Sequence, residues 1–331
     1  MNDLRKIKVS FPYKDSYFWH LQHSAPQRRQ QWQDLEFDFD NRYGEYDGWV
    51  VWQSYKGIEG EECCYCPPNK TVLIVREPPD VIELPDDYVK QFAAVVIPDR
   101  RVRHPNHYFE QFGQVWHIER DYDELQGMEP LTKSKVLSAV ISAKTDLVGH
   151  RQRLEFVNVL KRRFGDRLDH FGRGINPIKD KWDAVAPYRY HVTLENGEWD
   201  HYWTEKLVDA YLAWCLPIYV GAPNIQDYFD PRSLIIVDPR KPQRAIEIIE
   251  EAIATDAWAK ALPYIREARQ KILNEYHLYG LLERILNNTE PEPKVHVKLT
   301  SNTDISFSPR QQFGQRLRNG KQKLKSLLRL P

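Results

Sequence analysis

Two carboxylates, an amide and an amine lie close together near the middle of this 331-residue chain. Glu195 and Asn196 follow a β-branched run that predicts a strand, while Glu205 and Lys206 directly follow Thr204, a residue type that favours a helix N-cap. Free backbone N–H groups and the helix dipole make such a helix start favourable for an anion, and Lys206 adds a full positive charge. The spacing therefore predicts a phosphate site at the N-terminus of this helix.

The elements around these residues alternate between strands and helices. Strands are predicted over 136–142 and 168–171, with a helix over 151–164 between them, and two closing helices are predicted over 245–255 and 257–275. Alternation of this kind favours a parallel, doubly wound sheet whose ligand binds beyond the carboxyl ends of the strands. The second half of the chain therefore predicts an α/β nucleotide-binding domain.

The first part of the chain predicts a sheet-centred unit with many loops. Strands are expected over 72–75, 93–97 and 115–118, separated by proline-rich turns, and residues 127–132 resemble a linker. The expected organisation is an N-terminal α/β domain, a C-terminal Rossmann-like domain and a polar linker with a basic tail, over 1–132, 133–290 and 291–331.

Composition excludes several classes of protein. The 47 basic and 47 acidic residues give a formal net charge of zero, which argues against a dedicated nucleic-acid-binding protein. No stretch approaches the roughly 20 apolar residues of a membrane span. Residues 1–11 contain no apolar core of a secretory signal, so no such signal is expected.

Three of the four cysteines, Cys63, Cys64 and Cys66, form a cluster that raises the question of zinc. A structural zinc site needs four ligands, and no second Cys or His pair follows at the usual spacing. His104 or His107 would reach the cluster only if the chain folded back. We therefore expect reduced thiols in a loop.

The stretch 190–238 also resembles a known family. The tripeptide LEN ending at Asn196, the run DHYWTEKLVDAYLAWCLPIYVGAPN over 200–224, and the later YFDP and VD are similar to the donor-site signature of glycosyltransferase family 10. These are the α-1,3/4-fucosyltransferases, which use GDP-fucose. The resemblance implies a GT-B fold, with two Rossmann-like domains facing a cleft, the donor nucleotide on the C-terminal domain and the acceptor mostly against the N-terminal one.

The resemblance also implies roles for the residues around the predicted helix start. Tyr202 would contact the nucleotide, Glu205 would bind ribose hydroxyls or the sugar, and Lys206 would bind phosphate. Asn196 would hold the sugar or a phosphate. Glu195 would either orient Lys206 or face the cleft.

Further donor residues are implied on neighbouring elements. Arg153 matches a family arginine that reaches the diphosphate, and its neighbour Arg151 is the alternative. Lys144 would add positive charge in a loop where this chain departs from the Ser-Asn of the family. Gly172 opens a Gly-Arg-Gly turn that would let the backbone approach guanine or phosphate.

The family places its proposed catalytic base directly after an N-terminal-domain strand, and Glu77 takes that position here. Inverting transfer needs such a base, and it needs positive charge or N–H donors for the departing diphosphate. The alternative bases are Glu83, Asp99 and His104. No metal or other cofactor is expected, because lysine and arginine can neutralise the diphosphate.

The expected activity is inverting transfer of L-fucose from GDP-β-L-fucose to a glycan hydroxyl, with α-1,3 linkage to N-acetylglucosamine or glucose. The same fold using another GDP-sugar, and a non-catalytic protein that binds glycans or sugar nucleotides, are the alternatives. The partners expected are therefore a GDP-sugar and a glycan, with no nucleic acid.

The compartment is inferred from the two ends of the chain. Animal Golgi members carry an N-terminal anchor, so its absence suggests a cytoplasmic enzyme of bacterial or viral type. From Arg310 to Arg329, basic residues and leucines alternate without an acid. This pattern predicts either a basic amphipathic helix on the anionic inner face of a membrane or a disordered, solvated tail.

Overall fold

The computed structural model describes residues 4–12, 14–143 and 148–317. The chain divides into two compact units. The first unit comprises Met1–Lys14, Leu35–Phe109 and Leu286–Pro331, and the second comprises Asp15–Asp34 and Glu110–Ile285. Among the described residues, no helix combines the length and the apolar character needed to cross a bilayer.

This division differs from the expected boundary at residue 132. The segment that follows Phe109 is already bound into the second unit: Gln114 N donates to Tyr276 O at 2.7 Å, and His117 N donates to an Asp209 carboxylate oxygen at 2.9 Å. Residues 115–118, expected to be a strand, form no strand. His117 N donates to Asp209 and Trp116 O contacts His20 Nδ1 at 2.9 Å, so these backbone groups pair with side chains and not with a neighbouring strand.

The first unit is built on a parallel sheet. Its strands are β1 (Arg5–Ser10), β3 (Leu35–Asp38), β4 (Gly48–Gln53), β6 (Thr71–Val75), β7 (Ala94–Val96) and β8 (His107–Tyr108). They lie in the order β3-β1-β4-β6-β7-β8, and each neighbouring pair is parallel. Every residue of β4 and β6 is buried, which explains their nearly uninterrupted apolar sequences.

A second, antiparallel pair completes this unit. Strand β5 (Glu61–Cys66) pairs with β14 (Val295–Thr300). The unit also contains η2 (Pro68–Lys70), α2 (Asp86–Val89) and a helix over 309–317. The polar linker expected from residue 291 is therefore wrong over β14, whose cross-strand partner is more than 200 residues earlier in the sequence.

The cysteine cluster lies on strand β5, and the expected loop is wrong. Successive side chains of a strand point to opposite faces, so Cys64 and Cys66 share one face and are buried, while Cys63 is exposed. Among the described residues, no group of three or more His, Cys, Asp or Glu side chains is arranged to hold a metal ion.

The second unit contains another parallel sheet, formed by β9 (Lys135–Val140), β10 (Leu168–Phe171), β11 (Tyr188–Leu194), β12 (Leu216–Val220) and β13 (Ile235–Ile236). Strand β2 (Gln31–Trp32) also falls in this unit but is not a strand of this sheet. Its helices are α1 (Lys14–His23), α3 (Tyr122–Gln126), α4 (Val148–Phe164), α5 (Trp182–Val185), α6 (Glu205–Leu212), α7 (Pro242–Ala254), α8 (Ala257–Lys271) and α9 (Leu278–Leu286). Short 3₁₀ turns cover Pro26–Arg28, Gly165–Arg167, Ile225–Asp227 and Pro231–Ser233, and a π-helical turn covers Ile272–Tyr276.

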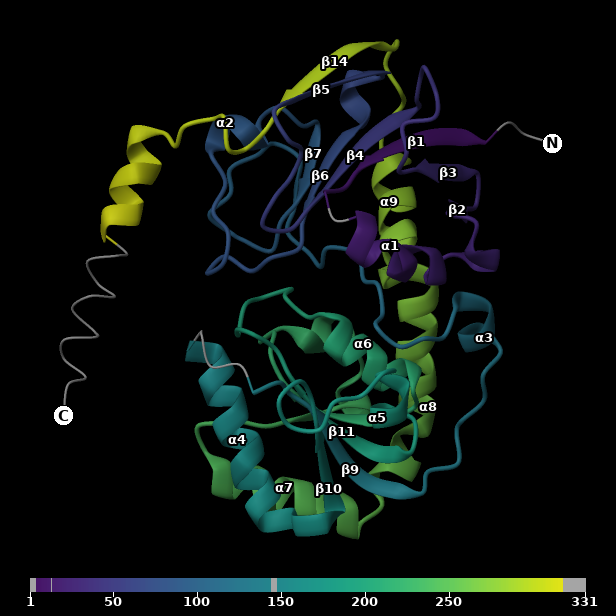
Figure 1. Ribbon diagram of the computed structural model, residues 1–331, viewed down its shortest axis with the longest axis vertical. Coiled ribbons are helices and arrows are strands. Elements are labelled where there is room, and N and C mark those ends of the chain that lie inside the picture. The colour runs from purple at the N-terminus through teal and green to yellow at the C-terminus, as the bar shows by residue number, and fades with distance from the viewer. Residues whose placement is uncertain (1–3, 13, 144–147, 318–331) are drawn as a thin grey trace. The chain divides into compact units, whose positions relative to one another are not determined.

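Helices cover the sheet of this unit on both sides. Within the unit, Figure 1 shows α4 and α7 to the left of the sheet and α8 to its right. Helix α4 packs on β10 and α7, whereas α6 packs on β11, β12 and α8. The helix predicted over 151–164 and the strand over 168–171 are confirmed. Helix α6 ends at Leu212, because Trp214 takes a left-handed conformation (φ 61°) and the chain then enters β12.

The strand order of the second sheet, β10-β9-β11-β12-β13, determines where a ligand can bind. If the five strands of this sheet are numbered in chain order, their order in space is 2-1-3-4-5, and it reverses between β9 and β11. Doubly wound sheets bind ligands beyond the carboxyl ends of their strands at this reversal. Residues after β9 and β11 are therefore the first place to look for a site.

Candidate active site

The loop after β11 and the start of α6 are joined by one buried carboxylate. The Glu195 side chain, fully covered, accepts hydrogen bonds from Thr204 N and Thr204 Oγ1, both at 2.8 Å. Thr204 is the N-cap of α6, as predicted, and accepts from Lys206 N at 3.4 Å. Burial raises the pKa of Glu195, and Lys206 offsets part of this. Glu195 thus fixes the geometry of the helix start.

Lys206 lies among three oxygen acceptors. Its Nζ is 3.0 Å from Thr204 Oγ1, 3.2 Å from Glu205 Oε1 and 3.5 Å from Glu195 Oε2. Burial acts to lower the pKa of Lys206, but Glu205 and Glu195 outweigh it and raise the pKa. The ammonium is therefore charged at neutral pH.

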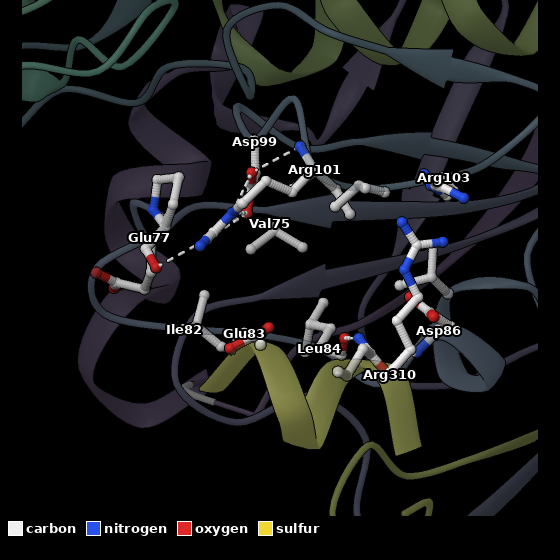
Figure 2. A pocket seen from close by; sticks show the side chains of 16 residues that line it. Val75, Glu77, Ile82, Glu83, Leu84, Asp86, Asp99, Arg101, Arg103 and Arg310 are labelled. Carbon is white, nitrogen blue, oxygen red and sulfur yellow. Dashed lines mark hydrogen bonds and ion pairs between the residues drawn. The ribbon is translucent and has the colours of Figure 1, made fainter. Parts of the chain in front are cut away.

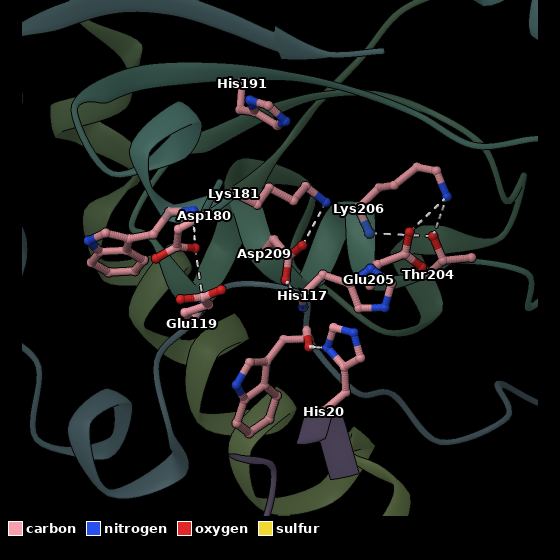
Figure 3. Close-up of polar contacts among 12 residues, drawn as sticks. His20, His117, Glu119, Asp180, Lys181, His191, Thr204, Glu205, Lys206 and Asp209 are labelled. Carbon is pink, nitrogen blue, oxygen red and sulfur yellow. Dashed lines mark hydrogen bonds and ion pairs between the residues drawn. The ribbon is translucent and has the colours of Figure 1, made fainter. Parts of the chain in front are cut away.

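The carboxylate of Glu205 is held in its charged form by its neighbours. Burial acts to raise the pKa of Glu205, but the positive charges of Lys206, His117 and Lys181 outweigh it and hold the pKa well below the ordinary value. Figure 3 shows His117 directed toward Glu205 and Lys206 beside Thr204. The helix start therefore carries a defined arrangement of opposite charges.

Arg153 reaches this cluster from helix α4. Its Nη1 donates to Leu194 O, the last carbonyl of β11, at 3.4 Å, and its side chain is half-buried. Burial lowers the pKa of Arg153, while Glu195, Tyr202 and Glu205 act in the opposite direction. Arg151, two residues earlier, is exposed. The structure therefore places Arg153 at the end of β11.

The other expected donor residues differ in accessibility. Tyr202 is 3% exposed, and its ring centroid lies 5.8 Å from that of Phe112, so little of this ring is available to a ligand here. Asn196 is exposed on the loop after β11. Lys144 lies outside the described residues, and the structure does not place it.

Gly172 has a clear structural requirement. Its φ is +141°, and a Cβ atom built there would lie 2.3 Å from Ile141 O, in the segment that follows β9. Gly172 N donates to Asn176 O at 2.9 Å, which closes the Gly-rich turn. Only glycine permits this close approach of two backbones beside the switch point.

Sequence reasoning missed a buried network beneath α6. Asp209 is fully covered, binds Lys181 Nζ at 2.6 Å and accepts from His117 N at 2.9 Å (Figure 3). Burial raises the pKa of Asp209 to about 6, with Lys181 acting against this shift. Asp209 is the one acidic residue in the buried stretch 207–212 of α6, and that contrast is the signal that could have identified it.

The expected catalytic base lies in the first unit. Glu77 follows β6 and accepts a hydrogen bond from Ser54 Oγ. It lines a pocket of about 250 Å³ (Figure 2). Two of the alternative bases, Glu83 and Asp99, line the same pocket. The third alternative, His104, does not line it, and its Nε2 contacts Phe92 O at 2.9 Å.

Comparison with known proteins gives matches concentrated in the second unit. Residues 131–256 match the model of the family described as glycosyltransferase family 10 (fucosyltransferase), C-terminal. The α-(1,3)-fucosyltransferase FucT of Helicobacter pylori is 34% identical over 74 residues, 22% of this chain and 16% of that protein. The GDP-fucose protein O-fucosyltransferase 3 of Danio rerio is 31% identical over 108 residues, 32% of this chain and 23% of that protein. Each match thus spans less than a quarter of the relative.

The fold comparison extends over most of the chain. A crystal structure of an α1,3-fucosyltransferase with GDP aligns with a TM-score of 0.50 at 18% identity, over 83% of this chain and 93% of that one. A second crystal structure of an α1,3-fucosyltransferase, with GDP-fucose, aligns with a TM-score of 0.50 at 17% identity, over 88% of this chain and 92% of that one. At these identities the likeness shows the fold alone. The fold class is GT-B, with two α/β units on parallel sheets, as expected from the sequence, and residues 131–256 are the part of the chain that is similar to the C-terminal domain of glycosyltransferase family 10.

Proposed function

We propose that this protein is a glycosyltransferase that moves L-fucose from GDP-β-L-fucose to a hydroxyl of a glycan. The observation that carries this proposal is the cluster of Arg153, Glu195, Glu205 and Lys206 at the carboxyl end of β11, inside the segment that matches the fucosyltransferase family. The named relatives, two of them solved in complex with GDP or GDP-fucose, support the choice of donor.

The geometry suits recognition of a diphosphate by Lys206 and Arg153. A lysine ammonium has three N–H donors, and here all three have an acceptor within 3.5 Å. The longest of these contacts, to Glu195, is the one that a phosphate oxygen would most easily replace, because Glu195 keeps its two hydrogen bonds to Thr204. Arg153 would provide a second positive charge through a planar guanidinium that matches phosphate geometry.

The proposed reaction is a single displacement with inversion. The acceptor hydroxyl attacks the anomeric carbon of fucose, the bond to the GDP oxygen breaks, and the sugar carries oxocarbenium character midway. Glu77 takes the hydroxyl proton as general base, and Lys206 and Arg153 stabilise the negative charge on the departing diphosphate. Tyr202, Asn196 and the turn at Gly172 remain proposed nucleotide or sugar contacts.

Thermal stabilisation by nucleotides tests the donor assignment. A ligand that binds the folded state raises its stability by roughly RT ln(1 + [L]/Kd). We expect GDP and GDP-fucose to raise the melting temperature, and UDP-glucose and CMP-sugars to leave it unchanged. Comparison with GDP-mannose separates fucose from other GDP-sugars. A shift with a different nucleotide, or with none, would refute the proposed donor.

The alternative of a non-catalytic binding protein is separated by turnover. GDP release from GDP-fucose in the presence of a glycan acceptor panel supports the enzyme, with N-acetylglucosamine and glucose termini included to test the expected α-1,3 transfer. Binding of GDP-fucose without transfer to any member of the panel would favour the non-catalytic alternative.

A further inference from the structure

The pocket beside Glu77 is built from two segments that are distant in sequence. Residues 75–103 provide most of its lining, including Val75, Ile82 and Ile97, and Arg310 and Gln311 add a second wall from the helix over 309–317. Its volume of about 250 Å³ is below the roughly 300–1,000 Å³ that drug-sized ligands occupy. The pocket therefore fits one small unit, such as a single saccharide ring, with an apolar middle for its C–H face.

Gln311 fixes the helical wall to the rest of the pocket. Its Nε2 donates to Leu84 O at 2.8 Å, and its Oε1 accepts from Asp86 N at 3.1 Å. One turn later, Gln315 Nε2 donates to a Glu83 carboxylate oxygen at 3.2 Å. These contacts satisfy backbone groups of the 84–86 segment, so the helix is an integral part of the pocket and positions Arg310.

The charges that line the pocket fall into two groups. Each carboxylate has a partner within the unit. Three of them accept a hydrogen bond: Glu77 from Ser54, Glu83 from Gln315, and Asp86 from Ser308 at 3.4 Å. The fourth, Asp99, forms an ion pair with Arg101 at 2.7 Å. By contrast, Arg103 and Arg310 are exposed and form no ion pair or hydrogen bond within the part of the chain that the structure describes. Figure 2 shows both arginines at the end of the pocket away from Glu77.

Two guanidinium groups without a carboxylate partner, at one end of a pocket, suit an anionic ligand group. Arginine is the residue best matched to carboxylate and phosphate oxygens, because its N–H donors form a planar fork. We propose that this pocket binds a saccharide that carries an anionic group, a carboxylate or a phosphate, with Arg103 and Arg310 holding that group and Glu77 facing the opposite end of the sugar. This inference rests on the proposed function, because it assigns the acceptor class to the pocket of the proposed base.

Binding of matched saccharides to the full chain tests the inference. Saturation-transfer NMR at millimolar saccharide compares methyl β-D-glucuronide with methyl β-D-glucoside, which differ only in the carboxylate, and adds glucose 6-phosphate to separate carboxylate from phosphate. We expect one of the anionic sugars to bind at least about tenfold more tightly than the neutral one, in line with a hydrogen bond to a charged group.

Variants localise the effect. Arg103→Gln and Arg310→Gln should each remove most of the preference for the anionic sugar, whereas Arg316→Gln, a change at an exposed arginine of the same helix that does not line the pocket, should retain it. Equal binding of charged and neutral sugars, no saccharide binding, or a preference unchanged in both pocket variants would overturn the inference.

A parallel titration with GDP separates this inference from the proposed function. GDP binding should be unchanged in Arg103→Gln and Arg310→Gln, which also verifies that the variants fold. If the protein binds GDP but does not prefer the anionic sugar, the proposed donor stands and the assignment of an anionic acceptor is wrong. If the protein prefers the anionic sugar but does not bind GDP, the anionic pocket stands and the proposed fucosyl transfer is wrong.

Discussion

The charged side chains of the two candidate sites, one in each unit, differ in whether they form ion pairs within the protein. In the second unit, the charges at the start of α6 are paired with each other: Lys206 contacts Glu195 and Glu205, and Lys181 contacts Asp209 beneath them. In the pocket of the first unit, Arg103 and Arg310 line the wall without an ion pair among the described residues. Paired charges create a rigid, pre-arranged site, whereas unpaired arginines are available for a charged group brought by a ligand.

The two sites also differ in how the chain assembles them. In the second unit, Glu195, Glu205 and Lys206 lie on one continuous segment, 195–206, within the family match at 131–256, and Arg153 joins them from helix α4. The pocket of the first unit combines residues 75–103 with a helix over 309–317. A contiguous site leaves a motif in the sequence, and an assembled pocket does not.

The largest expected effect comes from removing the proposed base in the first unit. Glu77→Gln should lower fucosyl transfer by roughly 100- to 10,000-fold, the usual contribution of general base catalysis, and leave GDP binding unchanged. Initial rates and GDP titrations measure the two effects. Glu83→Gln, in the same pocket, is the matched control and should keep its rate. Normal transfer by Glu77→Gln would assign the proton transfer to another group.

The buried network of the second unit predicts a pH-dependent stability. Asp209 has a pKa of about 6 in the folded state against 3.8 ordinarily, so between these values the folded protein binds more protons than the unfolded one. The protonated Asp209 therefore adds to the free energy of unfolding below pH 3.8, and this contribution is lost as the pH rises through 6. Its size is roughly 3 kcal/mol, since a shift of one pKa unit corresponds to about 1.4 kcal/mol.

Denaturant unfolding of the wild type and Asp209→Asn between pH 4 and 7 measures this contribution. The difference in unfolding free energy, wild type minus variant, should fall across that range, because the asparagine does not titrate. Asn158→Asp, a change at an exposed position of α4, adds a solvated carboxylate as a control and should show a nearly pH-independent difference. A constant difference for Asp209→Asn would show that this carboxylate keeps an ordinary pKa.

Removing the ammonium at the start of α6 should weaken binding of the donor nucleotide and leave binding of the acceptor unchanged. Lys206→Met keeps most of the side-chain volume and should weaken GDP binding about 10- to 150-fold, the range for a hydrogen bond to a charged group. Isothermal titration with GDP measures it, and Lys260→Met, at an exposed position of α8, is the control. Binding of saccharide in the first unit should not change. Full GDP affinity in Lys206→Met would remove Lys206 from the proposed site.

The smallest expected effect is that of a chelator. If lysine and arginine neutralise the diphosphate, as proposed, transfer rates should be the same with and without EDTA. Addition of Mg²⁺ or Mn²⁺ after EDTA treatment is the matching control. Loss of activity on chelation and its recovery with metal would instead require a cation beside the diphosphate, and would change the proposed role of Lys206.

Local sequence patterns determined the elements of the second unit well. The N-cap at Thr204, the helix ending at Phe164 and the strand at Leu168–Phe171 follow from short-range preferences, and they occur where predicted. The sequence also indicated the family and the fold class, because residues 195–206 are contiguous and their spacing is set by one strand, one loop and one helix start.

Tertiary structure decided what depends on distant partners. Strand β14 exists because β5 supplies its hydrogen bonds, the cysteines lie on a strand for the same reason, and residues 115–118 are held by groups on other elements and not by a sheet. The unit boundaries, the Asp209–Lys181 pair and the wall that Gln311 fixes beside Glu77 are likewise set by contacts between residues far apart in the chain. A sequence records local propensity directly, but it records such contacts only through the fold that brings them together.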